Sequence, residues 1–218
     1  MSIKDDIINY LEKNKLSTEE IGDILGKTGV VKNIYPIISG KYIVGEIQYF
    51  YAYSNSNWPI HEQLINLKPN RIAFFDSIFV EDYALFGELV STFILDKKKA
   101  KAIVVNGLMR DLNGIKQRGY PVWCKGITPI GCFNISVNKN AEITRRAQKA
   151  LDYYSGSIAV CDDSGVVVIP KEEINEKFID KMQKMSNQEK IWFDCVENKN
   201  WNTYDTVCLK KYLEEKNE

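Results

Sequence analysis

The chain has 218 residues, of which 44% are hydrophobic and 27% are charged. This is ordinary globular composition, with enough apolar residues for one sizeable core. The 29 basic and 29 acidic residues leave a formal net charge of zero, which speaks against a general nucleic-acid binder. We expect one α/β domain over residues 1–186 and a helical tail over residues 187–218 that packs on the same domain.

The sequence also bears on where the protein works. No apolar stretch approaches the roughly 20 residues that span a membrane, so we expect no membrane partner. The N-terminus is amphipathic and acidic early, unlike a signal peptide. The cysteines are odd in number and form no Cys-x-x-Cys pair: Cys124, Cys132, Cys161, Cys195 and Cys208. We therefore predict a cytoplasmic protein with reduced thiols.

The first half of the chain alternates between helical and strand-like patterns. Apolar residues at helical spacing predict an N-terminal helix, and the capping box at 17–20 predicts that a second helix follows. β-Branched and aromatic residues predict strands over 42–53, 71–76 and 100–106. Between these strands, helical patterns cover 60–68 and 87–98. This alternation is typical of α/β folds.

The second half contains shorter elements. We expect short strands around Val122, Phe133, Ile158 and Val167, and a turn at 162–165 that makes a hairpin of the last two. The segments 138–154 and 172–185 have helical patterns. The hairpin pattern at 161–172 carries no chemistry of its own.

The first candidate for chemistry is "ALFGELV" (84–90), where a glycine opens a helix. The first turn of a helix has unpaired N–H groups and the positive end of the helix dipole. Glycine also lets a ligand approach the backbone closely. The N–H groups of Gly87 to Val90 are thus suited to a carboxylate or phosphate. Taken alone, the motif is more simply a glycine at the start of a surface helix.

The second candidate is the pair Arg110-Asp111, just past the end of a strand-like run. The planar guanidinium suits a carboxylate or an enolate oxygen. The carboxylate oxygens of Asp111 suit Mg²⁺ or Mn²⁺. A structural ion pair, or an aspartate that caps the next helix, explains the same residues equally well.

Other catalytic classes find little support. His61 is the only histidine, which argues against a zinc site or a Ser-His-Asp triad. A single histidine at the start of a helix is more often a packing or capping residue than a ligand. The sequence contains neither a Walker A motif nor a dinucleotide-binding glycine-rich loop.

Six segments in order resemble the RraA-like family, which includes regulators of RNase E activity and class II aldolases for 4-hydroxy-4-methyl-2-oxoglutarate. This resemblance implies a compact swivelling-type α/β/α domain that assembles as a homotrimer or a hexamer. The segments are "GDILGK" (22–27), "SNWPIHEQL" (56–64), "ALFGELV" (84–90), "VVNGLMRD" (104–111), "PVWCKGITP" (121–129) and "VCDDSGVVVIP" (160–170).

The resemblance also implies roles for individual residues. It implies that Arg110 and the turn formed by Gly87, Glu88, Leu89 and Val90 bind a small α-keto acid. It further implies that Asp111 carries a divalent cation, Mg²⁺ or Mn²⁺, and that Asn57 and the Glu88 carboxylate assist catalysis.

The activity implied is that of a lyase, an aldolase or an oxaloacetate decarboxylase, which passes through a pyruvate enolate. A metal ion on the keto oxygen and a nearby cation would stabilise that enolate. The alternative is a non-catalytic member of the family that regulates or binds an RNA-processing protein.

The sequence departs from the family pattern near the expected site. Twenty-two residues separate Gly87 from Arg110, one or two more than the pattern has. Asn106 stands where an aspartate usually precedes the Arg-Asp pair, and Gly114 stands where many members carry an acid. Asn106 and Gly114 are both close in sequence to Asp111, the predicted metal ligand.

Overall fold

The computed structural model describes residues 2–214, and the chain divides into two compact units between Asn175 and Glu176. The boundary predicted between residues 186 and 187 therefore falls inside one helix, α7 (Glu176–Glu197). The packing of the tail on the domain stays a prediction, and residues 1 and 215–218 lie outside the described part. Among residues 2–214, no helix is both long enough and apolar enough to cross a membrane.

The first unit is built on one seven-stranded sheet in the order β1-β5-β4-β3-β2-β6-β7. The four central strands β5, β4, β3 and β2 run parallel, whereas β1, β6 and β7 pair antiparallel with their neighbours. The strands are β1 (Tyr35–Pro36), β2 (Ile43–Tyr53), β3 (Ile72–Ile78), β4 (Ala102–Met109), β5 (Val122–Ile127), β6 (Ile158–Cys161) and β7 (Val166–Ile169).

The sheet curls until it is nearly closed. Trp123 on β5 is fully buried, and its indole N–H donates to the carbonyl of Asp162 at the β6–β7 turn, 2.7 Å away. Strands near the two opposite edges of the sheet, β5 and β7, thus contribute to one apolar cluster, which includes Trp123, Val166 and Val168. This curvature brings sequence positions that are far apart into one core.

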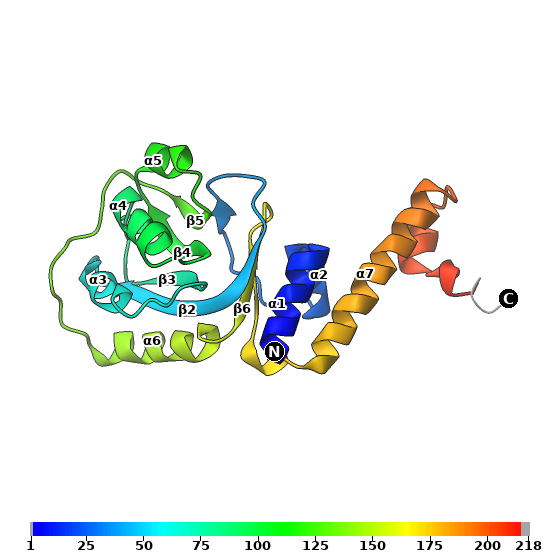
Figure 1. Ribbon diagram of the computed structural model, residues 1–218, viewed down its shortest axis with the longest axis horizontal. Coiled ribbons are helices and arrows are strands. Elements are labelled where there is room, and N and C mark those ends of the chain that lie inside the picture. The colour runs from blue at the N-terminus through cyan, green and yellow to red at the C-terminus, as the bar shows by residue number, and fades with distance from the viewer. Residues whose placement is uncertain (1, 215–218) are drawn as a thin grey trace. The chain divides into compact units, whose positions relative to one another are not determined.

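Helices cover both faces of the sheet, as Figure 1 shows. On one face lie α3 (Trp58–Leu64) and α4 (Glu88–Thr92), which continues as a π-helical turn over Phe93–Lys97. On the other face lies α6 (Ala141–Tyr154). The predicted α/β/α architecture is therefore confirmed. The remaining helices of this unit are α1 (Ile3–Asn14), α2 (Thr18–Ile24), α5 (Leu112–Gln117) and a 3₁₀ turn (Lys171–Glu173).

Neighbouring residues of β3 show why both faces need cover. Side chains alternate between the two faces of a strand. Phe74 stacks on Tyr154 of α6 with ring centroids 4.2 Å apart, whereas Phe75 meets Phe86 at 4.8 Å on the opposite face. Both phenylalanines are fully buried. Parallel strands buried on two faces read as the nearly continuous apolar runs seen in the sequence.

Most of the predicted local elements are confirmed. The capping box forms as expected: Ser17 accepts from the Glu20 N–H, and Glu20 accepts from the Ser17 N–H. The late helix begins later than predicted, at Glu176, and a 3₁₀ turn (Lys171–Glu173) occupies its expected start. The helical pattern over 138–154 corresponds to α6.

The strand expected around Phe133 is wrong. Phe133 lies in a loop, and its backbone N–H and carbonyl bond to the carbonyl of Asn55 and the N–H of Asn57. Only an isolated bridge to Ser56 forms. The apolar residue pattern was correct, but the backbone pairs with another loop rather than with a strand.

The second unit contains α7, a π-helical turn (Tyr204–Cys208) and a 3₁₀ turn (Lys211–Leu213). Its small interior is organised around Tyr212, whose hydroxyl accepts hydrogen bonds from Gln188 and from the Trp192 indole. Tyr212 and Cys195 are buried. The aromatic residues of the predicted tail thus have an internal packing role.

Candidate active site

The glycine turn and the Arg-Asp pair meet where β4 ends. Arg110 and Asp111 directly follow β4, and the segment leading to Gly87 runs beside that strand end. The Leu85 N–H donates to the Leu108 carbonyl at 2.9 Å, and the Arg110 N–H donates to the Phe86 carbonyl at 3.1 Å. Carboxyl ends of parallel strands are the usual place for ligands in α/β sheets. The predicted proximity of Gly87 to Arg110 and Asp111 is confirmed.

Gly87 is required by this close approach. A Cβ atom placed on Gly87 would overlap the Asp111 carboxylate and would lie only 2.8 Å from Cγ of Arg110. Gly87 is buried and occupies the N-cap position of α4. The glycine therefore permits contact between the start of α4 and the Arg-Asp pair.

Asp111 adopts an unusual backbone conformation, with φ 60° and ψ 40°. This left-handed region is uncommon for residues other than glycine, asparagine and aspartate. Although Asp111 occupies the N-cap position of α5, its side chain makes no capping bond there. Its Oδ2 instead accepts the Glu88 N–H at 3.1 Å and lies 3.7 Å from Nε of Arg110. Of the earlier alternatives, helix capping is wrong, and the ion pair with Arg110 is present.

The Glu88 side chain takes a path that the sequence did not indicate. Its Oε1 accepts a hydrogen bond from Nε of Arg118 at 2.6 Å, and this bond raises the pKa of Arg118. Its Oε2 fills the space that a Cβ on Gly114 would need. Sequence reasoning missed Arg118. The available signal was its spacing of seven residues, about two helical turns, from Asp111.

Arg110 rests on a second glycine. A Cβ on Gly131 would lie 2.6 Å from Nη1 of Arg110, so the guanidinium lies directly against that backbone. The Ala84 N–H and carbonyl bond to Ile130 and Cys132, which holds this loop beside the site. About half of the Arg110 side chain, 48%, is exposed and accessible to a ligand. Gly131 was also missed, because only its place in the fold marks it.

Asn57 supports the glycine turn from behind. Its Nδ2 donates to the carbonyl of Leu85 at 3.0 Å, two residues before Gly87. Its Oδ1 is buried and has no hydrogen-bond partner within residues 2–214. Buried polar atoms are nearly always paired, so this acceptor is notable.

An apolar hollow adjoins the same turn. His61, Leu64, Leu89, Val90 and Phe93 line a cavity of about 330 Å³. Leu89 is 84% exposed although it is a large apolar side chain. His61 thus lies near the candidate site, beside residues predicted to bind substrate.

The site offers a divalent cation one well-placed carboxylate. Residues 2–214 contain no cluster of three or more His, Cys, Asp or Glu side chains that could hold a metal ion. Mg²⁺ characteristically keeps several waters and binds through one or two carboxylates. Asp111 is 45% exposed and has a single backbone donor on Oδ2, so it fits a cation of this kind.

These features define an α/β protein with a glycine-led helix start packed against an Arg-Asp pair. A model of the family described as "RraA-like: Aldolase/RraA" matches residues 16–168, and the chain belongs to this RraA-like family. The match covers every residue of the candidate active site.

Two relatives have similar sequences. The protein named "Putative 4-hydroxy-4-methyl-2-oxoglutarate aldolase" of Halalkalibacterium halodurans is 26% identical over 180 residues, 78% of this chain and 79% of that protein. Protein DlpA of Legionella pneumophila is 27% identical over 169 residues, 73% of this chain. The matched part spans only 27% of the length of DlpA.

Solved structures share the fold. An uncharacterised protein of Pseudomonas syringae pv. tomato superposes with a TM-score of 0.71 at 16% identity and covers 96% of both chains. RraAS2 of Streptomyces coelicolor is described as an unusual member of the RNase ES inhibitor RraA protein family. It superposes with a TM-score of 0.61 at 17% identity over 85% of this chain and 92% of its own.

Proposed function

We propose that this protein is a divalent-metal-dependent lyase that cleaves a small α-keto acid, as an aldolase or an oxaloacetate decarboxylase. The observation that carries the proposal is the contact of Gly87 with both Arg110 and Asp111. This contact unites an anion-binding backbone, a planar cation and a carboxylate in one site. The named aldolase relative supports the same reaction class.

Substrate binding is assigned to Arg110 and the start of α4. The exposed guanidinium of Arg110 can hold a carboxylate or an enolate oxygen at two points. The first-turn N–H groups of Leu89 and Val90 are available for the other oxygens of the substrate. The Glu88 N–H is not available, because Asp111 accepts it.

Asp111 would hold Mg²⁺ or Mn²⁺, and such an ion, when bound, polarises the keto oxygen of the substrate. Arg110 stabilises the negative charge that develops as the carbon–carbon bond breaks. Asn57 keeps the turn in place through the Leu85 carbonyl. Glu88 lies beside Gly114, so its carboxylate takes the space of the acid that many family members carry there.

The direct test is pyruvate release by the purified full chain. The substrates are 4-hydroxy-4-methyl-2-oxoglutarate and oxaloacetate, each with Mg²⁺, with Mn²⁺ and with a chelator. We expect release from at least one substrate with metal, and its loss with the chelator. No release from either substrate with either metal would contradict the lyase assignment.

We also propose that the protein assembles as a homotrimer or hexamer with the site at a subunit interface. Large exposed apolar side chains on α3, at its C-cap, and on α4 and its π-helical turn support this, because monomers rarely leave large apolar patches exposed. They are Trp58, Ile65, Leu89 and Phe93, which are 40%, 71%, 84% and 41% exposed. Multi-angle light scattering at micromolar concentration tests the proposal, and a monomer would contradict it.

The second candidate function is that of a non-catalytic regulator of an RNA-processing protein in the cytoplasm, without direct nucleic-acid binding. The pairing of Glu88 with Arg118 and the glycine at position 114 favour it, because the Glu88 carboxylate is committed to Arg118 and no second acid stands at position 114. The fold likeness to RraAS2 is compatible with it. Binding to a purified RNase E-type enzyme, without turnover of either keto acid, would support this alternative.

A further inference from the structure

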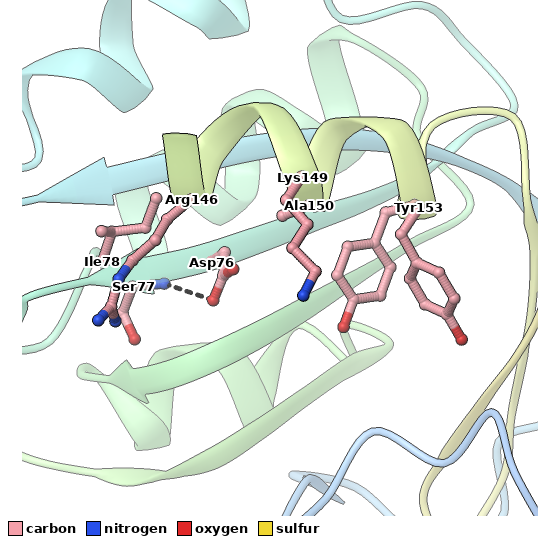
Figure 2. A pocket seen from close by; sticks show the side chains of 8 residues that line it. Asp76, Ser77, Ile78, Arg146, Lys149, Ala150 and Tyr153 are labelled. Atoms are coloured by element: carbon pink, nitrogen blue, oxygen red, sulfur yellow. Dashed lines mark hydrogen bonds between the residues drawn. The ribbon is translucent and has the colours of Figure 1, made fainter. Parts of the chain in front are cut away.

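A second hollow lies on the opposite face of the sheet from Gly87. A cavity of about 360 Å³ opens between β3 and α6, and this volume is within the range of small-molecule sites. Figure 2 shows the α6 side chains directed toward the strand that carries Asp76. Its polar lining consists of Asp76 and Ser77 from β3, and Arg146, Lys149, Tyr153 and Tyr154 from α6.

The Asp76 carboxylate forms a fixed floor. Its Oδ1 accepts from the Ser77 N–H and from Nδ2 of Asn106, both at 2.9 Å. Its Oδ2 accepts from the Tyr49 hydroxyl at 3.2 Å. A carboxylate has about four acceptor positions, so Oδ2 retains capacity for one more donor.

The aromatic wall beside Asp76 is rigidly packed. Tyr154 stacks on Phe74 at 4.2 Å and on Tyr49 at 5.7 Å. Burial and the nearby Asp76 carboxylate raise the pKa of the Tyr154 hydroxyl, which therefore stays protonated at neutral pH. A protonated hydroxyl at this place can donate a hydrogen bond to a ligand.

The rim carries two cations one helical turn apart. Nε of Arg146 donates to Glu142 at 2.7 Å, and its guanidinium lies 4.4 Å from the ring centre of Phe79. The Lys149 ammonium has neither a hydrogen bond nor an ion pair with any residue in the range 2–214. Figure 2 shows Lys149 reaching down from α6 toward Asp76. An unpaired cation above a fixed acceptor suits a ligand that carries both a negative charge and a donor.

We propose that this cavity binds a small hydroxylated anion, a hydroxycarboxylate or a sugar-type phosphate ester. Lys149, with Arg146 beside it, binds the anionic group, and a ligand hydroxyl donates to the free position on Oδ2 of Asp76. This site is separate from Gly87, Arg110 and Asp111. The proposed binding at this cavity therefore does not depend on the proposed lyase reaction.

The experiment is two-dimensional NMR of the ¹⁵N-labelled full chain titrated with D-gluconate, glycerol 3-phosphate and hexanoate. Gluconate and hexanoate have the same chain length but differ in hydroxyl groups. We expect saturable shifts of the amides at 76–78 and 146–154 with gluconate or glycerol 3-phosphate, and weaker binding of hexanoate. Which of the two hydroxylated anions binds more tightly distinguishes a carboxylate site from a phosphate site.

Two matched variants on α6 sharpen the result. Lys149→Gln removes a cavity cation, whereas Arg145→Gln removes a cation that pairs with Glu142 outside the cavity. We expect Lys149→Gln to weaken binding about tenfold or more, as loss of a charged hydrogen bond implies, and Arg145→Gln to leave it unchanged. The proposal is overturned if neither hydroxylated anion binds, if hexanoate binds equally well, if Lys149→Gln binds normally, or if the shifts occur at residues 87–90 and 110–111.

Discussion

The candidate active site lies at the carboxyl end of β4 and the α6 cavity at the carboxyl end of β3, yet the two are built in opposite ways. At the active site the charges are paired, Arg110 with Asp111 and Arg118 with Glu88. Glycines there allow side chains to touch the backbone. In the α6 cavity, Lys149 has neither a hydrogen bond nor an ion pair with any described residue, and the space beside it is open. One region is specified by close packing, which constrains substitutions, and the other by unused charge, which invites a ligand.

The largest expected effect is at Asp111. If Asp111 carries the metal, Asp111→Ala should lower metal-stimulated pyruvate release by about 2–4 kcal/mol of transition-state stabilisation, the scale of a lost oxyanion donor. Arg110→Lys should fail similarly, because an ammonium cannot replace the two-point guanidinium. Steady-state kinetics with Mg²⁺ measure both. Asp152→Ala, which removes an exposed carboxylate on α6, serves as the control and should retain full activity.

An Asp111→Ala variant with wild-type activity would remove the metal assignment. The folded state of each variant is checked by circular dichroism. Both side chains are about half exposed, so each variant should still fold, although Asp111→Ala places alanine at a left-handed φ of 60° and should lose some stability.

The next effect concerns stability. Gly87→Ala places a Cβ against Asp111 and Arg110 and should destabilise the protein by about 1–3 kcal/mol, the usual cost of overpacking. Gly22→Ala is the matched control, because nothing lies within 4 Å of its new Cβ in helix α2. That variant should be more stable by about 0.5–1 kcal/mol, since alanine favours helices over glycine. Urea denaturation measures both, and equal effects would contradict the close packing at Gly87.

A smaller stability effect is expected at Gly114. A Cβ there overlaps only the end of the flexible Glu88 side chain, which can move away, so Gly114→Ala should cost below about 1 kcal/mol. The change should nevertheless detach Glu88 from Arg118. If Glu88 supplies the acid of the site, this displacement of its carboxylate should also lower pyruvate release.

A double variant can move the carboxylate from position 88 to position 114. Gly114→Glu combined with Glu88→Ala should restore activity or metal affinity lost in Glu88→Ala alone. Metal affinity is measured by calorimetry with Mn²⁺. No recovery would mean that position 114 does not face the substrate or the metal.

The smallest effect is a difference in thiol reactivity. Burial raises the pKa of Cys132, near Gly131, and of Cys124 to about 11 each. Both thiols therefore remain protonated, and unreactive, until the pH rises toward that value. The Cys208 thiol is exposed to solvent. Iodoacetamide at pH 8 should modify Cys208 first, as mass spectrometry of peptides can show. Modification of Cys132 at an equal rate would mean that the loop at the active site opens.

The sequence alone predicted those features that depend on residues only a few positions apart. The capping box at Ser17, the helix over 138–154 and the apolar strands follow from local periodicity and turn chemistry. The order of six motifs also identified the family and located Gly87 next to Arg110 and Asp111. In those places local preference and the global fold agree.

Tertiary structure alone decided the rest. Glu88 and Arg118 lie 30 residues apart, and Asn57 and Leu85 lie 28 apart, so no periodicity links them. The unpaired state of Lys149 depends on how α6 crosses β3, and Phe133 lies in a loop because its backbone partners are other loops. Local patterns specify which face of an element is apolar. The path of the backbone between elements specifies which polar groups meet, and that path depends on the packing of the whole core.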